Sequence, residues 1–327
     1  MIKLFYKYFL FLIHNSSIMV GGQAVIEGVM MRAPGAYATA VRDPEGTVQI
    51  VYKKHQSIVE KYQITKIPVL RGFLHLVDSM KIGYQTLDWS SSIAEETNIK
   101  KNPYIDWGLS ILSIFFAIFL FMGIPYFFTE IIISKQDIDN NFLFNILAGL
   151  LRILVFVVYL FTLSQLNDVK RLFQYHGAEH KVVFNFESGK KINIINAQQF
   201  STYHPRCGTS FMFILMIVTI FTYSIIDSAF MIVFNTVNFN IILRIGLHLL
   251  CLPIVAGLGY EVLKLLSKHQ DKFIFYILSL PGLWLQRITT KNPTDAQVEV
   301  SISALNAAFN NELSKFEGQQ HVADAIG

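Results

Sequence analysis

The sequence predicts an α-helical polytopic membrane protein with about four transmembrane helices, a small cytoplasmic N-terminal region that holds a β-hairpin and a helix, and a cytoplasmic C-terminal helix. Three observations predict this class. Apolar residues make up 53% of the 327 residues and charged residues only 15%, whereas soluble domains are about a quarter charged. The apolar residues are concentrated in long runs. Lysine and arginine are concentrated between and after those runs.

Four apolar segments are long enough to cross a hydrocarbon core of about 30 Å, which takes roughly 20 residues. We expect them at about Trp107–Phe128, Phe142–Leu163, Thr209–Ile226 and Ile241–Tyr260. Between the last two, Phe230–Asn240 is expected to form an apolar turn or a re-entrant piece. Arg244 and His248 are expected at the outer end of the fourth span, where an arginine side chain can snorkel to the surface.

Positive charge predicts the orientation of these spans. The 164–208 loop and the tail after residue 260 are rich in lysine and arginine, whereas the 129–141 loop carries Lys135 among acidic residues. Because positively charged loops stay in the cytoplasm, we expect a multi-pass protein of the cell inner membrane with both termini in the cytoplasm. The lipid bilayer is thus its first predicted partner.

The sequence pattern divides the chain into four regions. Residues 1–18 are interpreted as a misassigned start before Met19 or as an interfacial anchor. Residues 19–105 form the predicted cytoplasmic N-terminal region, with a hairpin at Tyr37–Lys53 and an amphipathic helix at Pro68–Trp89. Residues 106–263 form the membrane region. Residues 264–327 hold an interfacial segment, broken at Pro281, and a helix that Thr294 caps and that extends through Leu313.

The predicted amphipathic helix has one apolar face. Its members are Leu70, Phe73, Leu74, Val77 and Met80.

The motif His176-Gly-Ala-Glu179-His180 carries the main chemical signal. Its spacing, H-x-x-E-H, is that of an inverted zinc-protease motif. On a helix, histidines four positions apart lie on one face and can bind one ion. The motif therefore predicts a divalent metal site, with zinc as the expected ion and Glu179 as the general base for a bound water.

Catalytic zinc takes three protein ligands and keeps one open position. The candidates for the third ligand are His204, Cys207 and Glu261, all predicted on the cytoplasmic side. A closed site of three histidines and Cys207 would instead be structural. Arg206 and Arg71 are candidates for binding an anionic transition state or a lipid headgroup.

The charge and the cysteine content disfavour a nucleic-acid-binding protein and a disulfide-stabilised fold. The net charge of +4 is modest and spread along the chain, so nucleic acid is not an expected partner. The two cysteines, Cys207 and Cys251, provide no disulfide framework.

Several sequence blocks resemble one known group of proteins. The block Gly21–Arg32 (GGQAVIEGVMMR), the block Pro68–Gly72 (PVLRG) and the two histidine-containing blocks resemble the bacterial and plastid YqhQ-like family, as do AGLGYE at 256–261 and PGLWLQRITT at 281–290. That family is a domain of unknown function, DUF1385, labelled as predicted metal-dependent enzymes. The resemblance implies that Glu27, Arg32 and Arg287 also fall within its motif blocks.

Three functions are consistent with these features. The first is a metal-dependent hydrolase that acts on a membrane peptide or lipid. The second is a non-enzymatic membrane scaffold or assembly factor with a structural metal. The third is a transporter component, which is disfavoured because few ionisable residues lie within the spans.

Overall fold

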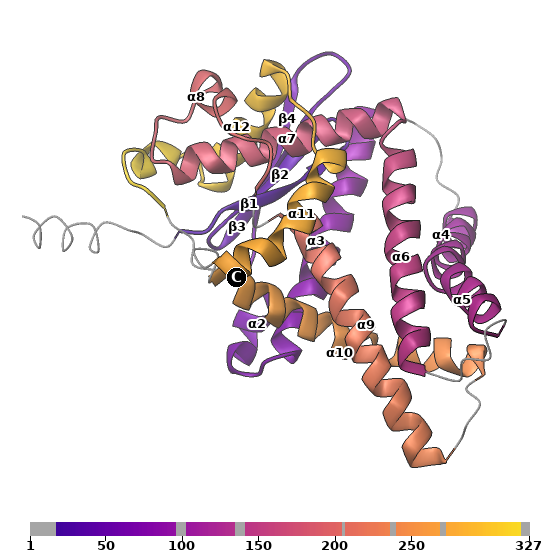
Figure 1. The fold of residues 1–327 in the computed structure, drawn as a ribbon. Coiled ribbons are helices and arrows are strands. Elements are labelled where there is room, and N and C mark those ends of the chain that lie inside the picture. Colours follow the sequence, from indigo (N-terminus) through magenta and orange to yellow (C-terminus); the bar gives the residue numbers. More distant parts are fainter. Residues whose placement is uncertain are drawn as a thin grey trace, which may run out of the picture.

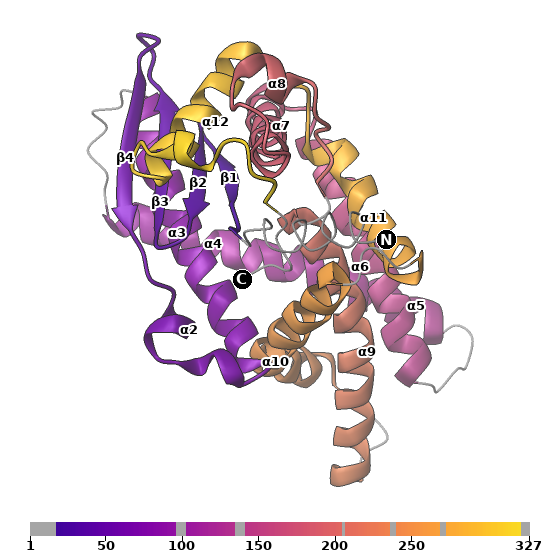
Figure 2. The same cartoon turned by 90° about the vertical axis from the view of Figure 1, so that its left-hand side faces the viewer.

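The computed structural model describes residues 18–95, 103–134, 141–204, 207–235, 240–268 and 273–321. In Figures 1 and 2, a small sheet and the helices beside it lie at one end of the molecule, and long apolar helices form the other end. The interpretation of residues 1–18 falls almost wholly outside the described residues.

The sheet is an antiparallel meander of four strands in the order β1-β2-β3-β4. Its strands are β1 (Gly21–Val25), β2 (Gly28–Ala33), β3 (Ala36–Arg42) and β4 (Val48–Lys54). The predicted hairpin is confirmed as β3 and β4, with Thr39 opposite Val51. β1 and β2 were not predicted, because Met30 and Met31 are both buried and β2 therefore lacks the alternation of a half-exposed strand.

Helices cover both faces of the sheet. On one face, Val29, Met31 and Ala38 pack against α7 (Asn167–Glu187) and α12 (Asp295–Ala308). On the other face, Met30 and Val41 pack against Ile82 of α3 (Leu70–Ala94). The result is a three-layer arrangement at one end of the apolar helices (Figure 2). The short α8 (Ile194–Gln198) follows α7, so most of the predicted 164–208 loop is helical.

Helix α3 confirms the predicted amphipathic helix, and it follows two short helices, α2 (Ile58–Lys61) and η1 (Ile64–Lys66). Its apolar residues Leu70, Val77 and Met80 are exposed. Small and polar residues face the sheet instead. Gln23 of β1 donates a hydrogen bond to the Thr86 hydroxyl at 2.9 Å. The helix therefore binds the sheet through hydrogen bonds as well as through apolar contacts.

Four helical stretches are long and apolar enough to cross a membrane, as predicted. They are Trp107–Ile133, Leu143–Leu163, Met212–Phe234 and Ile241–Leu266. The first consists of α4 (Pro103–Ile118), the π-helical segment η2 (Phe119–Gly123) and α5 (Ile124–Ser134). The others belong to α6 (Asn141–Leu163), α9 (Gly208–Phe234) and α10 (Ile241–Lys268).

Three predicted boundaries are wrong. Residues 230–234 continue α9 rather than forming a turn, and the left-handed Asn235 (φ 48°) ends the helix; residues 236–239 are outside the described part. Helix α11 (Phe273–Thr289) continues through Pro281, whose fixed φ is compatible with a helix. Thr294 does cap α12, but the helix ends at Ala308, and the short η3 (Leu313–Phe316) follows the left-handed residues Asn310 and Asn311.

The predicted snorkelling of Arg244 is also wrong. Arg244 is 4% exposed, and its Nε lies 3.3 Å from a carboxylate oxygen of Asp227 in α9. His248 Nε2 lies 2.7 Å from the other oxygen, and Asn145 donates a hydrogen bond to the same carboxylate at 2.8 Å. Tyr126 completes this buried cluster between the apolar helices through a hydrogen bond to His248. A buried carboxylate close by is a better partner for Arg244 than a distant surface.

The π-helical segment also has a polar partner. A π-helical turn interrupts the regular hydrogen-bond ladder of a helix. Arg152 of α6 donates from Nε to the carbonyl of Phe121 in this segment at 2.9 Å. The only charge in the second predicted span thus ties α6 to an irregular turn of the first.

Candidate metal centre

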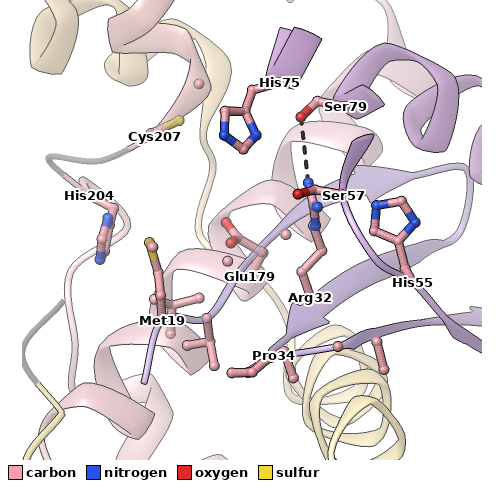
Figure 3. A pocket seen from close by; sticks show the side chains of 18 of the residues that line it. Met19, Arg32, Pro34, His55, Ser57, His75, Ser79, Glu179, His204 and Cys207 are labelled. Atoms are coloured by element: carbon pink, nitrogen blue, oxygen red, sulfur yellow. Dashed lines mark hydrogen bonds between the residues drawn. The ribbon is translucent and has the colours of Figure 1, made fainter. Parts of the chain in front are cut away.

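Helix α7 carries the predicted metal motif, and its middle is buried between the sheet and the segment around residue 204. His176 and His180 lie one helical turn apart, with ring centroids 4.5 Å from each other. Glu179 is 5% exposed, and Figure 3 shows its carboxylate pointing into a cavity. The helical placement that the spacing predicted is therefore observed.

Cys207 completes a group of three metal-binding side chains. It is the residue before α9, and its Sγ accepts a hydrogen bond from the backbone N–H of Thr209. Its Sγ lies 3.3 Å from Nε2 of His176. The ligand atoms of His176, His180 and Cys207 all lie within 4.8 Å of one another. Two imidazoles and a thiol at this spacing form a donor set that zinc prefers.

Backbone carbonyls orient both histidine rings. Nδ1 of His176 is 2.8 Å from the carbonyl oxygen of Thr289. Nδ1 of His180 likewise bonds the carbonyl oxygen of Thr202. Because a carbonyl only accepts, each Nδ1 carries a proton, and Nε2 is the atom that remains for a metal ion. Outer hydrogen bonds of this kind are typical of histidine ligands to metals.

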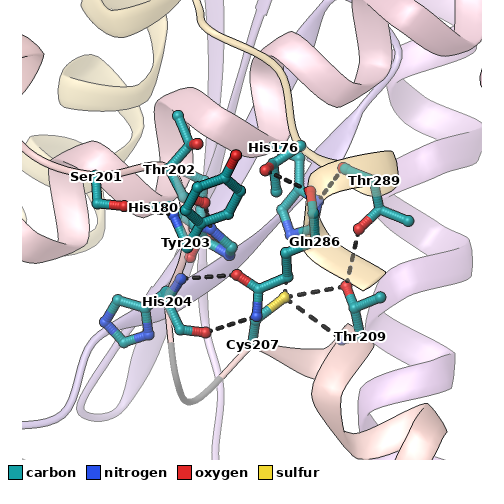
Figure 4. A network of polar contacts seen from close by, with 12 residues as sticks. His176, His180, Ser201, Thr202, Tyr203, His204, Cys207, Thr209, Gln286 and Thr289 are labelled. Atoms are coloured by element: carbon teal, nitrogen blue, oxygen red, sulfur yellow. Dashed lines mark hydrogen bonds and ion pairs between the residues drawn. The ribbon is translucent and has the colours of Figure 1, made fainter. Parts of the chain in front are cut away.

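The segments that supply those carbonyls are held tightly (Figure 4). The side chain of Gln286 in α11 accepts a hydrogen bond from the His204 N–H at 2.7 Å and donates one to the His204 carbonyl at 2.8 Å. Lys291 N–H donates to the carbonyl of Phe173 at 2.9 Å. A Cβ at Gly177 would lie 2.0 Å from the Lys291 carbonyl oxygen, so this position of the motif requires glycine.

The charges of the group follow from its contacts. Burial lowers the pKa of His176, but the neighbouring Cys207 and Glu179 outweigh burial and raise it to about 9. Burial raises the pKa of Cys207, but His176 and His180 hold it well below its usual range. The contact between the two side chains thus favours the charged form of each, a thiolate beside an imidazolium. A metal ion would take the place of the His176 proton.

The other predicted site residues lie in different places. Burial and His180 lower the pKa of His204 to about 4; this side chain lines the same cavity, and its Nε2 is 3.5 Å from Glu187. Glu261 forms a two-point ion pair with Arg71, whose Nε is 2.7 Å from Oε1. Arg206 is outside the described residues. The structure therefore brings three of the predicted ligands together and places His204 beside them.

A cavity of about 480 Å³ opens on this group. His176, Glu179, His180 and Cys207 line one part of it. The rest is lined by side chains of the sheet, of the segment after β4 and of α3, among them Arg32, His55, Ser57, His75 and Ser79 (Figure 3). Sequence reasoning missed His55, Ser57 and Ser79, because no spacing links them to the motif. Only the meander and α3 bring them to the cavity.

Comparison with known proteins places the chain in a family. The family model described as "Protein of unknown function (DUF1385)" matches residues 67–311. The chain belongs to the DUF1385 family. A relative, the "Uncharacterized protein YqhQ" of Bacillus subtilis (strain 168), is 32% identical over 321 residues, which cover 94% of this chain and 97% of that protein. The predicted resemblance is thus confirmed. No solved structure matches significantly. The DUF1385 match includes His176, His180 and Cys207, whereas strands β1–β4 precede it.

Proposed function

We propose that this DUF1385 protein is a metal-dependent hydrolase that works at the cytoplasmic boundary of the cell inner membrane. The observation that carries the proposal is the group of His176, His180 and Cys207, whose ligand atoms lie within 4.8 Å of one another. Both histidines are pre-oriented by backbone carbonyls. A hydrogen bond from the second ring nitrogen of this kind is typical of histidine ligands to metals.

The number of ligands favours catalysis over a structural role. Structural zinc sites have four protein ligands, whereas catalytic sites have three and an open position. The group formed by the described residues has three members, and all three line the cavity. When bound, the ion would lower the pKa of a coordinated water to about 7. Glu179, whose Oε2 is 3.5 Å from His180 Nε2, is placed to take the proton of that water.

The position of the cavity suggests the substrate. Cys207 and Gly208 line the cavity, and the apolar stretch of α9 begins at Met212. A peptide or lipid held in the membrane could reach this level without leaving the bilayer. The positively charged segments flanking the spans favour the cytoplasmic side. We therefore propose a membrane peptide or lipid as substrate.

Two variants test this function. Glu179→Gln should retain the metal and fail to complement a strain that lacks the gene, because its amide cannot accept the proton. His180→Ala should lose both the metal and complementation. Metal retention by Glu179→Gln with full complementation would contradict catalysis and support a scaffold with a structural metal.

A thiol hydrolase is the second candidate. The observation that favours it is the 3.3 Å contact between Cys207 Sγ and His176 Nε2, together with the lowered pKa of the thiol. A thiolate beside an imidazolium is an activated nucleophile. The two candidates differ in one measurement: a thiol hydrolase would be purified without metal and would be inactivated by iodoacetamide at Cys207.

A further inference from the structure

The wall of the cavity away from Cys207 is built from hydrogen-bond donors. Arg32 comes from β2, His75 and Ser79 come from α3, and His55 and Ser57 follow β4. Figure 3 shows Arg32 and Ser79 on one side of the cavity and Cys207 and His204 on the other, with His75 between Ser79 and Cys207. A molecule in the cavity would touch both walls.

Arg32 is the cation of this wall, and its contacts within the protein are loose. Its guanidinium lies 3.9 Å from the Asp78 carboxylate and 3.5 Å from the Ser79 hydroxyl. The Asp78 carboxylate is already bound more closely by His55 Nε2 at 2.8 Å. The Arg32 side chain is 35% exposed. By contrast, Arg71 forms a close two-point pair with Glu261.

The carboxylate of Glu60, which also lines the cavity, is engaged elsewhere. It accepts a hydrogen bond from the Ser57 N–H at 3.1 Å as part of a capping box. His75 stacks on Tyr260 with ring centroids 5.3 Å apart. Burial and the nearby Arg32 lower its pKa, which favours the neutral imidazole, and that form keeps one N–H to donate. Arg32 therefore supplies the positive charge, and its neighbours supply further donors.

We infer that Arg32, together with His75 and Ser79, binds an anionic phosphate group of the substrate across the cavity from the metal-binding group. This inference rests on the proposed function for the role of the metal, but the anion site itself does not. A guanidinium presents a planar fork of donors that matches phosphate oxygens in two-point contacts. The phosphate would hold the substrate while the bond to be hydrolysed lies near His180 and Glu179.

Phosphate could be presented by a lipid headgroup or by a soluble molecule. Apolar residues that line the same cavity, including Met19, Val20 and Val183, would suit the part of a lipid next to its headgroup. Two probes separate the sources: inorganic phosphate, and the short-chain lipid dihexanoyl phosphatidic acid. Tighter binding of the lipid would identify a headgroup site, and equal binding would identify a site for soluble phosphate.

Isothermal titration calorimetry on the full chain in an uncharged detergent tests the assignment. We expect Arg32→Gln to weaken binding of both probes at least tenfold. Arg32→Lys should give an intermediate loss, because it keeps the charge and removes the fork. Arg42→Gln is the matched control: Arg42 is in the same sheet, pairs with Glu299 and does not line the cavity. Its binding should equal that of the unmodified protein.

The metal-binding group is tested separately with His176→Ala/His180→Ala. This variant should keep its phosphate binding even if the proposed hydrolase function fails. Phosphate binding that is lost in this variant and retained in Arg32→Gln would place the anion on the histidine group and overturn the inference. Wild-type affinity in a folded Arg32→Gln protein, judged by an unchanged melting temperature, would overturn it as well, as would failure of both probes to bind the unmodified protein.

Discussion

The Sγ atom of Cys207 lies 3.3 Å from Nε2 of His176, although α8 and the rest of α7 separate the two residues along the chain. This contact turns a two-histidine motif into a group of three ligands. It also joins the start of the apolar helix α9 to the helix that packs against the sheet. The candidate site is thus located where the apolar helices and the sheet part of the molecule meet.

Substitution of Glu261, the candidate ligand that lies apart from the histidines, tests which residues belong to the metal-binding group. We expect Glu261→Gln to retain the metal, because Glu261 pairs with Arg71 rather than with the histidines. It should lower the free energy of unfolding by about 1.5–3 kcal/mol, since hydrogen bonds to charged groups contribute about that much. Metal content and urea denaturation measure the two effects. Loss of metal from a folded Glu261→Gln protein would show that this carboxylate is a ligand.

Two glycines of the histidine-containing blocks provide a matched pair of tests. Gly177→Ala should severely lower the yield of folded protein, because its Cβ would lie 2.0 Å from the Lys291 carbonyl oxygen. Gly208→Ala, next to Cys207, should have little effect, since no atom outside its immediate surroundings lies within 4 Å of the new Cβ. Size-exclusion chromatography of both variants checks this. Equal yields would mean that the 289–291 segment does not lie against α7.

Gln286 is predicted to hold the segment that precedes Cys207. In Gln286→Glu, a carboxylate can still accept from the His204 N–H but cannot donate to the His204 carbonyl. Because the side chain is fully buried, the lost bond should cost about 1–3 kcal/mol. A lower melting temperature with a reduced zinc affinity is the expected result. An unchanged melting temperature would show that this pair of bonds does not stabilise the segment.

The buried cluster of Asp227, Arg244 and His248 is expected to contribute strongly to stability. Asp227→Asn removes the charge that faces Arg244 and His248. Leaving a buried charge unpaired costs about 3–5 kcal/mol. The double variant Asp227→Asn/Arg244→Gln should be less destabilised than the sum of its single variants, as thermal unfolding in detergent would show. Additive effects would mean that Asp227 and Arg244 are not coupled.

The sequence predicts correctly those structural features that depend on neighbouring residues. The four apolar stretches, the β3–β4 hairpin and the capping of α12 by Thr294 each depend on neighbouring residues, and all are observed. The spacing of His176 and His180 likewise depends only on the helical repeat. Such features follow from periodicity and from hydrogen bonds within a few positions.

The rest depends on contacts between distant parts of the chain. His176 is oriented by Thr289, 113 positions away, and no local pattern predicts such a contact. Three residues were candidates for the third ligand, and only the course of the chain after α8 shows that Cys207 lies with the two histidines. Arg244 was misplaced because Asp227, its partner, belongs to another helix. Arg32 and His75 come together only because α3 crosses the sheet.

Elemental mass spectrometry of the purified protein tests the central claim most directly. The account predicts about one zinc per chain, lost in Cys207→Ala and in His176→Ala/His180→Ala. Cys251→Ala is the control, because Cys251 lies in α10 and is not a member of the group; it should keep its zinc. Folded protein that was never exposed to a chelator and holds no metal, or a Cys207→Ala variant that keeps its full metal content, would contradict the account.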